Sequence, residues 1–441
     1  MKYTRILFTK KIRKANEGYI EFIKVNMIQV LMSKLIGLKN DERIVRILEM
    51  AIPVLTGIFI FIVPFPHNSA IQEICFYLSI FLALILFLYK KREISFQSPL
   101  TVPFILFLIW TVVGLAAALN QQNTFHDIYA HLLKYLAIFY LVTNFFNNRK
   151  RFIILTWILI ISASIFSIGG IVYFYIISGN DLSARIGLPE IGIGVNYVGF
   201  FTIVAILFSI THLTTAANLS IKFASTICMF VPLVATILTG TRGTFLGLIL
   251  PLFLLFSRHK KTVITFFLIF LVITSLFTPV KQILTPDAMI NKVKTESRLV
   301  IWHNYLNMIK DYPIAGIGYG IQTYDKKLID KYDSKDFPLH QLPYYFAPHN
   351  TFIDVTVRLG LVGLALFLYI IFVFGRMGWQ LIRHGYDDFI RTWALCVTAI
   401  FVSFLIQGMV ADMLLGIQII IFFVLMAMMS ILWRINGDCL V

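Results

Sequence analysis

Residues 344–368 read YYFAPHNTFIDVTVRLGLVGLALFL, and within them the chain passes from a polar, aromatic loop into an apolar helix. The apolar run extends from residue 350 to residue 375. This length exceeds the roughly 20 helical residues that cross about 30 Å of hydrocarbon. His349 stands at the entrance of this helix, and Arg358 follows nine residues later, where a charge is costly. The stretch therefore predicts a membrane span with polar residues that need an explanation.

The composition of the whole chain agrees with a membrane protein. Of its 441 residues, 59% are hydrophobic and 14% charged, and the mean hydropathy is +0.83, far from the balance of soluble proteins. The formal charge of +16 could indicate nucleic acid, but the basic residues form short clusters beside apolar runs, so we expect no nucleic-acid partner. The four cysteines show no CxxC spacing and no pair in a polar loop, so from the cysteines we expect no disulfide, zinc site or thiol catalysis.

Apolar segments recur along the chain and predict an all-α polytopic membrane protein with about twelve transmembrane helices. The eighth segment is short, and the others are long enough to span a bilayer. They comprise residues 47–65, 71–89, 99–119, 128–146, 152–177, 193–214, 222–239, 243–257, 262–279, 350–375, 392–410 and 413–433.

The charges between these segments alternate along the chain. Basic clusters such as residues 90–92, 149–151 and 258–261 fall on one side, which the positive-inside rule makes cytoplasmic. The short loops of the opposite side carry only Arg185 and Arg242. These two exceptions to the rule mark positions where function is expected.

This topology divides the chain into five regions: a cytoplasmic basic segment (1–46), helices 1–9 (47–279), one large extracytoplasmic loop (280–348), helices 10–12 (349–434) and a cytoplasmic tail (435–441). The first region carries eleven Lys or Arg residues and is either an amphipathic segment lying on membrane lipid or a frayed basic tail. No apolar region precedes residue 47, so we expect no cleavable signal peptide and a first span that acts as the targeting signal.

The large loop has local structure of its own. Residues 297–313, SRLVIWHNYLNMIKDYP, predict a helix, because Ser297 can cap its start, apolar residues recur at helical spacing and Pro313 follows its end. AGIGYG at 315–320 then breaks the chain with three glycines, and without a preceding strand it is weak evidence for a nucleotide fold. The acidic residues beyond it alternate with lysines, so we interpret them as a solvated loop and assign no metal: Asp330, Asp333 and Asp336.

A helical wheel through the opening stretch separates two groups of residues. One arc about 60° wide holds His349, Thr356 and the glycines Gly360 and Gly363. This small face predicts close contact with a neighbouring helix. On the opposite side Asp354 and Arg358 are spaced for an (i, i+4) ion pair that neutralises charge within the span.

Three basic residues on the extracytoplasmic side are candidates for function. His349 is either an ordinary interfacial histidine or a reactive group beside water. Arg242 lies in LTGTRGTFLG (238–247), between two glycines at the start of a span, where a helix N-terminus attracts anions. The alternative for Arg242 is snorkelling to lipid headgroups. Arg298 is a further candidate, although taken alone it is a solvated helix residue.

Three separated motifs together resemble the O-antigen ligase family and its polymerase relatives. They are TGTRG at a span junction, SRLVIWHNYLNMIKDYPIAGIGYG in the large loop, and PHNTFIDVTVRLGLVG, which reads as His-Asn, nine residues, then Gly-x-x-Gly. The resemblance covers roughly residues 190–370, and the first 190 residues share only a series of spans. It implies a class C architecture, an inner-membrane location and a catalytic site that faces the periplasm, so the large loop would be periplasmic.

The resemblance also implies an activity. The chain would be a metal-independent, inverting glycosyltransferase without a cofactor, which moves an assembled glycan from undecaprenyl pyrophosphate to lipid A-core. Arg242 and Arg298 would hold the pyrophosphate, His349 would sit at the reacting centre, and Asn350 would contact substrate. Two alternatives stay open: a polymerase, whose acceptor is another lipid-linked repeat, and a lipid-linked glycan flippase, which predicts charges along a midplane path. Neither the sugar nor the oligomeric state follows from the sequence.

Overall fold

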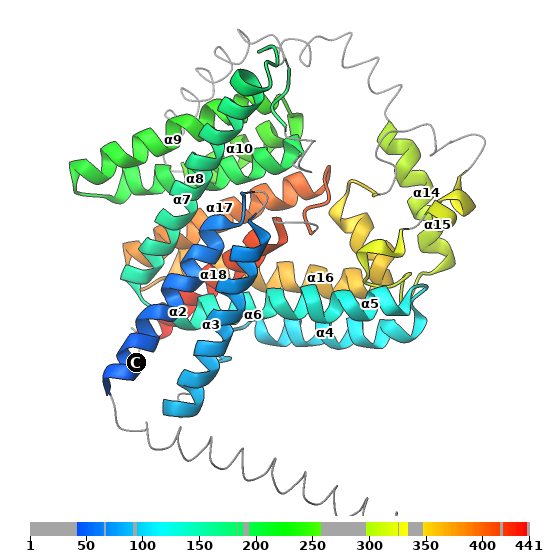
Figure 1. Cartoon of the computed structure of the whole chain (residues 1–441), viewed down its shortest axis with the longest axis horizontal. Coiled ribbons are helices and arrows are strands. Elements are labelled where there is room, and N and C mark those ends of the chain that lie inside the picture. The colour runs from blue at the N-terminus through cyan, green and yellow to red at the C-terminus, as the bar shows by residue number, and fades with distance from the viewer. Residues whose placement is uncertain are drawn as a thin grey trace, which may run out of the picture.

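The computed structural model describes residues 42–65, 68–90, 95–182, 184–187, 194–256, 297–324, 326–333, 347–414 and 418–438. These residues form helices joined by turns, with no strand among them (Figure 1). The predicted span 262–279, residues 1–41 of the basic segment and residues 439–441 of the tail lie outside the described residues, whereas residues 435–438 of the predicted tail belong to the last helix.

The described part of the chain contains eleven apolar helical segments that coincide with predicted spans. Nine are long enough to cross a membrane, and two are shorter, Thr101–Ala117 and Arg242–Leu255. The prediction of an all-α polytopic membrane protein is therefore confirmed. The first half of the chain contains α2 (Glu42–Ile62), α3 (Ser69–Lys90), α4 (Thr101–Gly114) with η1 (Leu115–Ala117), α5 (Gln121–Asp127), η2 (Ile128–Leu132), α6 (Leu133–Phe145), α7 (Arg149–Ile171) and η3 (Val172–Ile177).

The second half contributes the remaining spans and the described part of the large loop. The spans are α8 (Val195–Thr215), α9 (Leu219–Thr239), α10 (Arg242–Leu255), α16 (Thr351–His384), α17 (Asp388–Gly408) and α18 (Gln418–Asp438). The loop contains α14 (Ser297–Asp311), η5 (Ile321–Thr323) and α15 (Lys326–Tyr332). The predicted helix at 297–313 is thus confirmed, and it ends before Pro313.

Several helices begin at a residue that can satisfy their first backbone N–H groups. Side-chain oxygens of Asn or Asp accept these hydrogen bonds. The capping residues are Asn120 for α5, Asn148 for α7, Asn218 for α9, Asn350 for α16 and Asp387 for α17.

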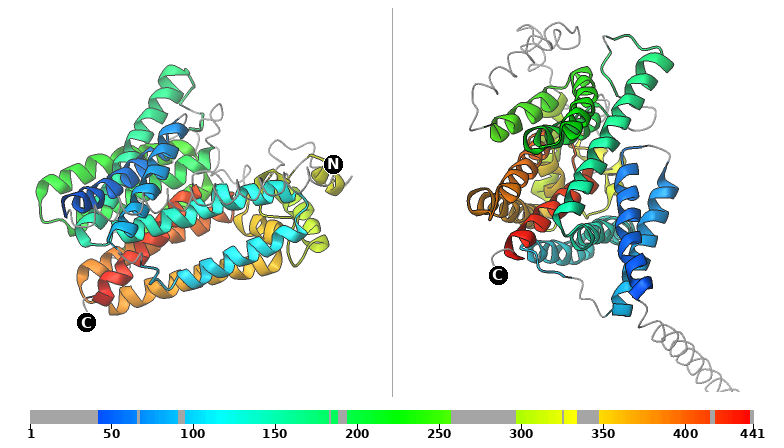
Figure 2. Two further views of the ribbon diagram at one scale, coloured as in Figure 1. Left: turned by 60° about the horizontal axis from the view of Figure 1, so that its bottom comes forward. Right: turned by 90° about the vertical axis from the view of Figure 1, so that its left-hand side faces the viewer.

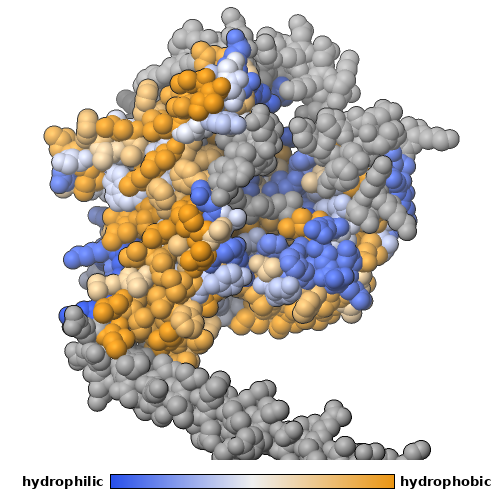
Figure 3. All heavy atoms as spheres, viewed as in Figure 1, coloured by the Kyte–Doolittle hydropathy of each residue, from blue (hydrophilic) through white to orange (hydrophobic). Residues whose placement is uncertain are grey.

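Two helices form the centre of the bundle. The most apolar windows of α8 and α18 are each 83% buried, whereas those of α3 and α9 are only 28% and 33% buried. A helix that is apolar on all sides and buried belongs to the interior, and helices with exposed apolar faces suit contact with lipid. Figure 2 shows α18 running through the assembly, and Figure 3 shows apolar side chains over the surface of α2 and α3.

The loop helices pack against one end of the bundle. α14 contacts α16, and η5 contacts α5, so we call this end of the bundle the loop end (Figure 1). Tyr305 and Ile301 of α14 are buried there, together with Ile317 of the glycine-rich segment, in a small apolar cluster that also includes Val357 of α16. The large loop is thereby fixed to the span that follows it.

α16 is broken at Gly360, where φ is 71° and ψ is −174°. The break frees backbone groups that a continuous helix would pair internally, and the glycine-rich segment pairs with them. Leu361 N donates to Pro313 O at 2.8 Å, Ile317 N to Val357 O at 2.9 Å and Gly318 N to Arg358 O at 3.0 Å. Non-helical backbone within a membrane span is tolerated when other parts of the protein pair with its free N–H and C=O groups. The segment AGIGYG therefore has a structural role here.

This break corrects the predicted helical wheel. His349 precedes the cap of α16 with φ of 49°, and Gly360 interrupts the helix, so the single arc is wrong. A Cβ at Gly360 would lie 1.9 Å from Ile314 O, which makes the close neighbour the loop backbone and not another helix. A Cβ at Gly363 would meet the side chain of Leu359 in the same segment.

Candidate functional site at the loop end

His349 lies in a tight turn between the large loop and α16. Its φ of 49° is the only positive value for a non-glycine residue in the described part of the chain, a conformation that costs energy and recurs at functional sites. Trp302 of α14 donates its indole N–H to Pro348 O at 2.9 Å. Asn350 caps α16, because its Oδ1 accepts from Phe352 N and Ile353 N. The histidine is therefore held from both sides.

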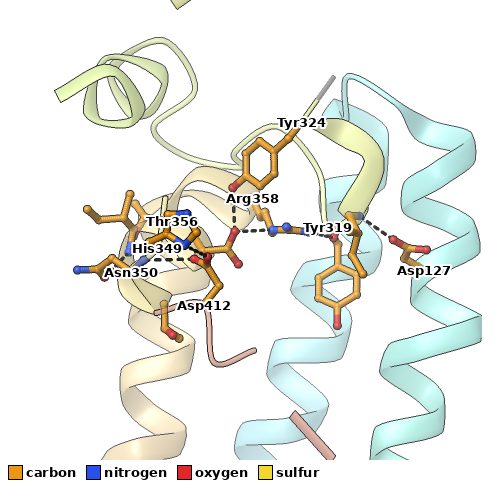
Figure 4. Close-up of polar contacts among 12 residues, drawn as sticks. Asp127, Tyr319, Tyr324, His349, Asn350, Thr356, Arg358 and Asp412 are labelled. Atoms are coloured by element: carbon orange, nitrogen blue, oxygen red, sulfur yellow. Dashed lines mark hydrogen bonds and ion pairs between the residues drawn. The ribbon is translucent and has the colours of Figure 1, made fainter. Parts of the chain in front are cut away.

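The partner of His349 is Asp412, which lies between α17 and α18. Its Oδ2 is 3.1 Å from His349 Nδ1, and its Oδ1 accepts from Asn350 N at 3.2 Å (Figure 4). The side chains of His349 and Asp412 are 33% and 10% exposed, so a nearly buried carboxylate faces a histidine that solvent can reach. Asp412 was not predicted as a site residue, although an acidic residue in a short turn between two apolar spans was an available signal.

The turn that carries Asp412 is anchored to the start of α16. Asn350 Nδ2 donates to Met409 O at 3.1 Å, Thr351 Oγ1 donates to Ala411 O at 3.0 Å, and Met413 N donates to Thr351 Oγ1 at 2.9 Å. These bonds fix the carboxylate relative to the imidazole. A carboxylate facing Nδ1 favours the tautomer with hydrogen on Nδ1, and Nε2 is then the ring atom that can accept a proton.

Arg242 is brought to the same end of the bundle. α9 ends at Thr239, Gly240 takes a left-handed conformation with φ of 54°, and α10 begins at Arg242. The predicted helix start at Arg242 is confirmed. A Cβ on Gly243 would lie 2.7 Å from Val410 Cγ2, so the start of α10 lies against the turn that carries Asp412.

Arg298 lies at the start of α14 and near a third arginine, Arg185. Arg185 Nε donates to Thr239 O at 2.9 Å, which places it at the end of α9. Burial and, second, the positive charge of Arg298 lower the pKa of the Arg185 guanidinium. The ends of α9, α10 and α14 thus gather positive charge of the kind that an anion would neutralise. The charge pattern marked Arg185 as a position of expected function, but no role for it was predicted from the sequence.

Asp354 and Arg358 form the predicted ion pair, with Arg358 Nε 2.8 Å from Asp354 Oδ1. Both side chains are buried, and Tyr324 O–H donates to the same carboxylate oxygen at 2.9 Å. Arg358 Nη1 also donates to Tyr319 O at 3.2 Å. This pair joins α16 to the large loop (Figure 4), so its observed role is structural.

The fold and the site define a class: a polytopic α-helical membrane protein with a histidine, an acid and several arginines at one end of its bundle. Residues 227–368 match the sequence family described as O-Antigen ligase, so the resemblance drawn from the motifs is confirmed. The matched region contains Arg242, Arg298, His349 and Asn350, whereas Asp412 lies beyond it.

Curated relatives occur in Rickettsia and carry the provisional name polysaccharide ligase. A protein of Rickettsia bellii (strain RML369-C) is 24% identical over 325 residues, which cover 70% of this chain and 74% of that protein. A protein of Rickettsia typhi is 36% identical over 131 residues, 27% of this chain and 31% of the relative. A protein of Rickettsia prowazekii is 36% identical over 121 residues, which cover 26% of this chain and 28% of the relative. The chain thus spans about a third of the length of the Rickettsia typhi relative.

Proposed function

We propose that the protein is an O-antigen ligase of the bacterial inner membrane. It transfers an assembled glycan from undecaprenyl pyrophosphate to a sugar hydroxyl of lipid A-core, and its loop end faces the periplasm. The observation that carries this proposal is the pairing of His349 Nδ1 with Asp412 at 3.1 Å, at the bundle end that also holds Arg242 and Arg298.

The proposed reaction is a single displacement. The acceptor hydroxyl attacks the anomeric carbon, the new glycosidic C–O bond forms, and the bond from that carbon to the pyrophosphate oxygen breaks. The proton of the hydroxyl passes to His349 Nε2, and the electron pair of the broken bond leaves with undecaprenyl pyrophosphate. Arg242 and Arg298 neutralise the charge on the leaving oxygens through their forked donors. Asn350 keeps His349 in place, because its side chain caps α16 and binds Met409 O, and its contact with the substrate stays a prediction.

Asp412 is assigned to positioning. Its carboxylate fixes the imidazole and stabilises the imidazolium that forms when the proton is taken up, as a buried acid does beside other catalytic histidines. The hydrogen bond from Asn350 N to the same carboxylate supports this assignment, because it sets the angle at which the acid meets the ring.

The charges within the spans weigh against a transporter. Lys134 and Arg358 are the residues that a midplane path would use. Lys134 is paired with Glu73, and Arg358 with Asp354. Lys134 is neutralised by a residue of α3 and Arg358 by a residue of its own helix, and such paired charges serve packing, whereas the basic residues at the loop end carry the charge that an anionic substrate would neutralise.

The experiment supplies purified protein with a lipid-linked glycan and either lipid A-core or more of the same donor. Glycan attached to lipid A-core supports the ligase, and a lengthened lipid-linked glycan would replace it with the polymerase. If neither product forms, the result would overturn both the ligase and the polymerase. His349→Ala should lower the rate of product formation on the order of 10²-fold or more, and His303→Ala, which changes an exposed histidine of α14, is the matched control that should not.

A further inference from the structure

Two histidines and an acid gather at the junction between α5 and η2, in a group that the proposed reaction does not use. His126 Nδ1 is 2.8 Å from Asp127 Oδ1, and His131 Nε2 is 3.7 Å from the same oxygen. The ligand atoms of all three side chains lie within 4.8 Å of one another. Imidazole nitrogens with a carboxylate oxygen are the donor set that zinc and related divalent ions prefer.

The local backbone explains why the two histidines meet. Residues five apart in an α-helix point roughly 140° away from each other, because each residue turns about 100°. Ile128–Leu132 is instead a π-helical turn, which is wider and recurs at functional sites. It brings the ring of His131 to 6.1 Å from that of His126, centre to centre. A regular helix would have left one histidine on each face.

The carboxylate between them is fixed by a second element. Asp127 is 4% exposed, and its Oδ2 accepts from Ile321 N of η5 at 2.6 Å (Figure 4). Its Oδ1 faces both histidines. A backbone donor on the far oxygen is the kind of outer contact that orients a metal ligand. His126 and His131 are 53% and 37% exposed, so an ion can enter from solvent and the rings have room to adjust.

We propose that His126, Asp127 and His131 bind one divalent transition-metal ion, with Zn²⁺ as the representative. Metal–ligand bonds of about 2.0 Å in a tetrahedral site place neighbouring ligand atoms about 3.3 Å apart. The two observed separations of 2.8 and 3.7 Å lie on either side of that value. The fourth position is left to water, and the histidines bind in their neutral form.

The position of the site gives the ion a structural consequence. Because the same carboxylate holds the backbone of η5, the ion joins α5 and η2 to the part of the large loop that follows AGIGYG. No metal was predicted from the cysteines or from the acidic residues Asp330, Asp333 and Asp336, and none of these residues belongs to this cluster. The proposed glycosyl transfer does not pass through this ion.

The test titrates Zn²⁺ into the full-length protein, purified in detergent and freed of metal with a chelator. Calorimetry should show one tight equivalent, and His126→Ala and His131→Ala should each weaken it by at least about tenfold, since loss of even an outer contact weakens metal binding by about 10- to 100-fold. His303→Ala is the control that should bind as the wild type does. Zn²⁺ should also raise the unfolding temperature of the wild type and of this control, but not of the two cluster variants.

Three outcomes would overturn the proposal. They are no uptake of Zn²⁺ by the wild type, equal uptake by His131→Ala, and equal affinity for Mg²⁺, which would indicate a hydrated acidic site instead of nitrogen ligands. None of these readouts depends on glycan transfer, so the metal site and the proposed function can fail separately.

Discussion

Gly360→Ala should destabilise the protein strongly, because the break in α16 requires a residue without a side chain. A non-glycine residue at φ of 71° and ψ of −174° costs about 1–3 kcal/mol. The added methyl would also lie 1.9 Å from Ile314 O and 2.3 Å from Ile314 C, and overpacking of this kind typically costs about 1–3 kcal/mol. Together the two effects lower the free energy of unfolding by about 2–6 kcal/mol.

The protein can relieve the clash only by moving the glycine-rich segment. That movement breaks the three backbone hydrogen bonds from Leu361, Ile317 and Gly318, each worth about 1 kcal/mol, and uncovers buried backbone groups. The loss in free energy of unfolding is thus of similar size whether the clash is retained or the loop segment moves away. Denaturant-induced unfolding of the purified protein measures it, and limited proteolysis near residue 314 reports whether the loop has left α16.

Gly375→Ala is the matched control on the same helix. A Cβ at Gly375 has no neighbour within 4 Å, and its φ is not positive, so alanine should be neutral or stabilise by up to about 1 kcal/mol through helix propensity. Equal unfolding midpoints for Gly360→Ala and Gly375→Ala would refute the reasoning, and the break would then be unnecessary for stability.

Four further predictions concern the proposed reaction and topology. His349→Ala should keep donor affinity while turnover falls on the order of 10²-fold or more; loss of donor binding would make this histidine a phosphate ligand. Arg242→Lys and Arg298→Lys should each weaken both donor affinity and turnover, because lysine lacks the planar fork. Asp412→Asn should lower kcat by about tenfold or more with KM nearly unchanged, and a change in KM alone would contradict positioning. A cysteine replacing Arg149 should resist labelling from outside intact cells, and its labelling would reverse the topology.

The spans were predictable because hydropathy is a local property of about 20 residues. The pair of Asp354 and Arg358 was predictable for the same reason, since helical spacing alone brings them together. Asp412 was not, because its contact with His349 joins turns that are far apart in the chain.

Two departures from a regular helix also escaped prediction. Apolar residues continue on both sides of Gly360, so the pattern resembles one unbroken span, and only the partner segment at 313–318 reveals the break. The π-turn at Ile128–Leu132 likewise leaves no periodic signal, because five residues are too few to shift the apolar pattern.

The broken helix has a consequence for how this protein can be recombined with its relatives. The segment 313–318 and the backbone at 357–361 complete each other's hydrogen bonds, although one belongs to the large loop and the other to a span. A chimaera that exchanges the loop at the apparent membrane boundary, residue 349, would separate the two halves of this joint. The exchangeable module therefore extends from α14 through residue 361, and loop grafts intended to alter acceptor choice should carry the start of α16 with them.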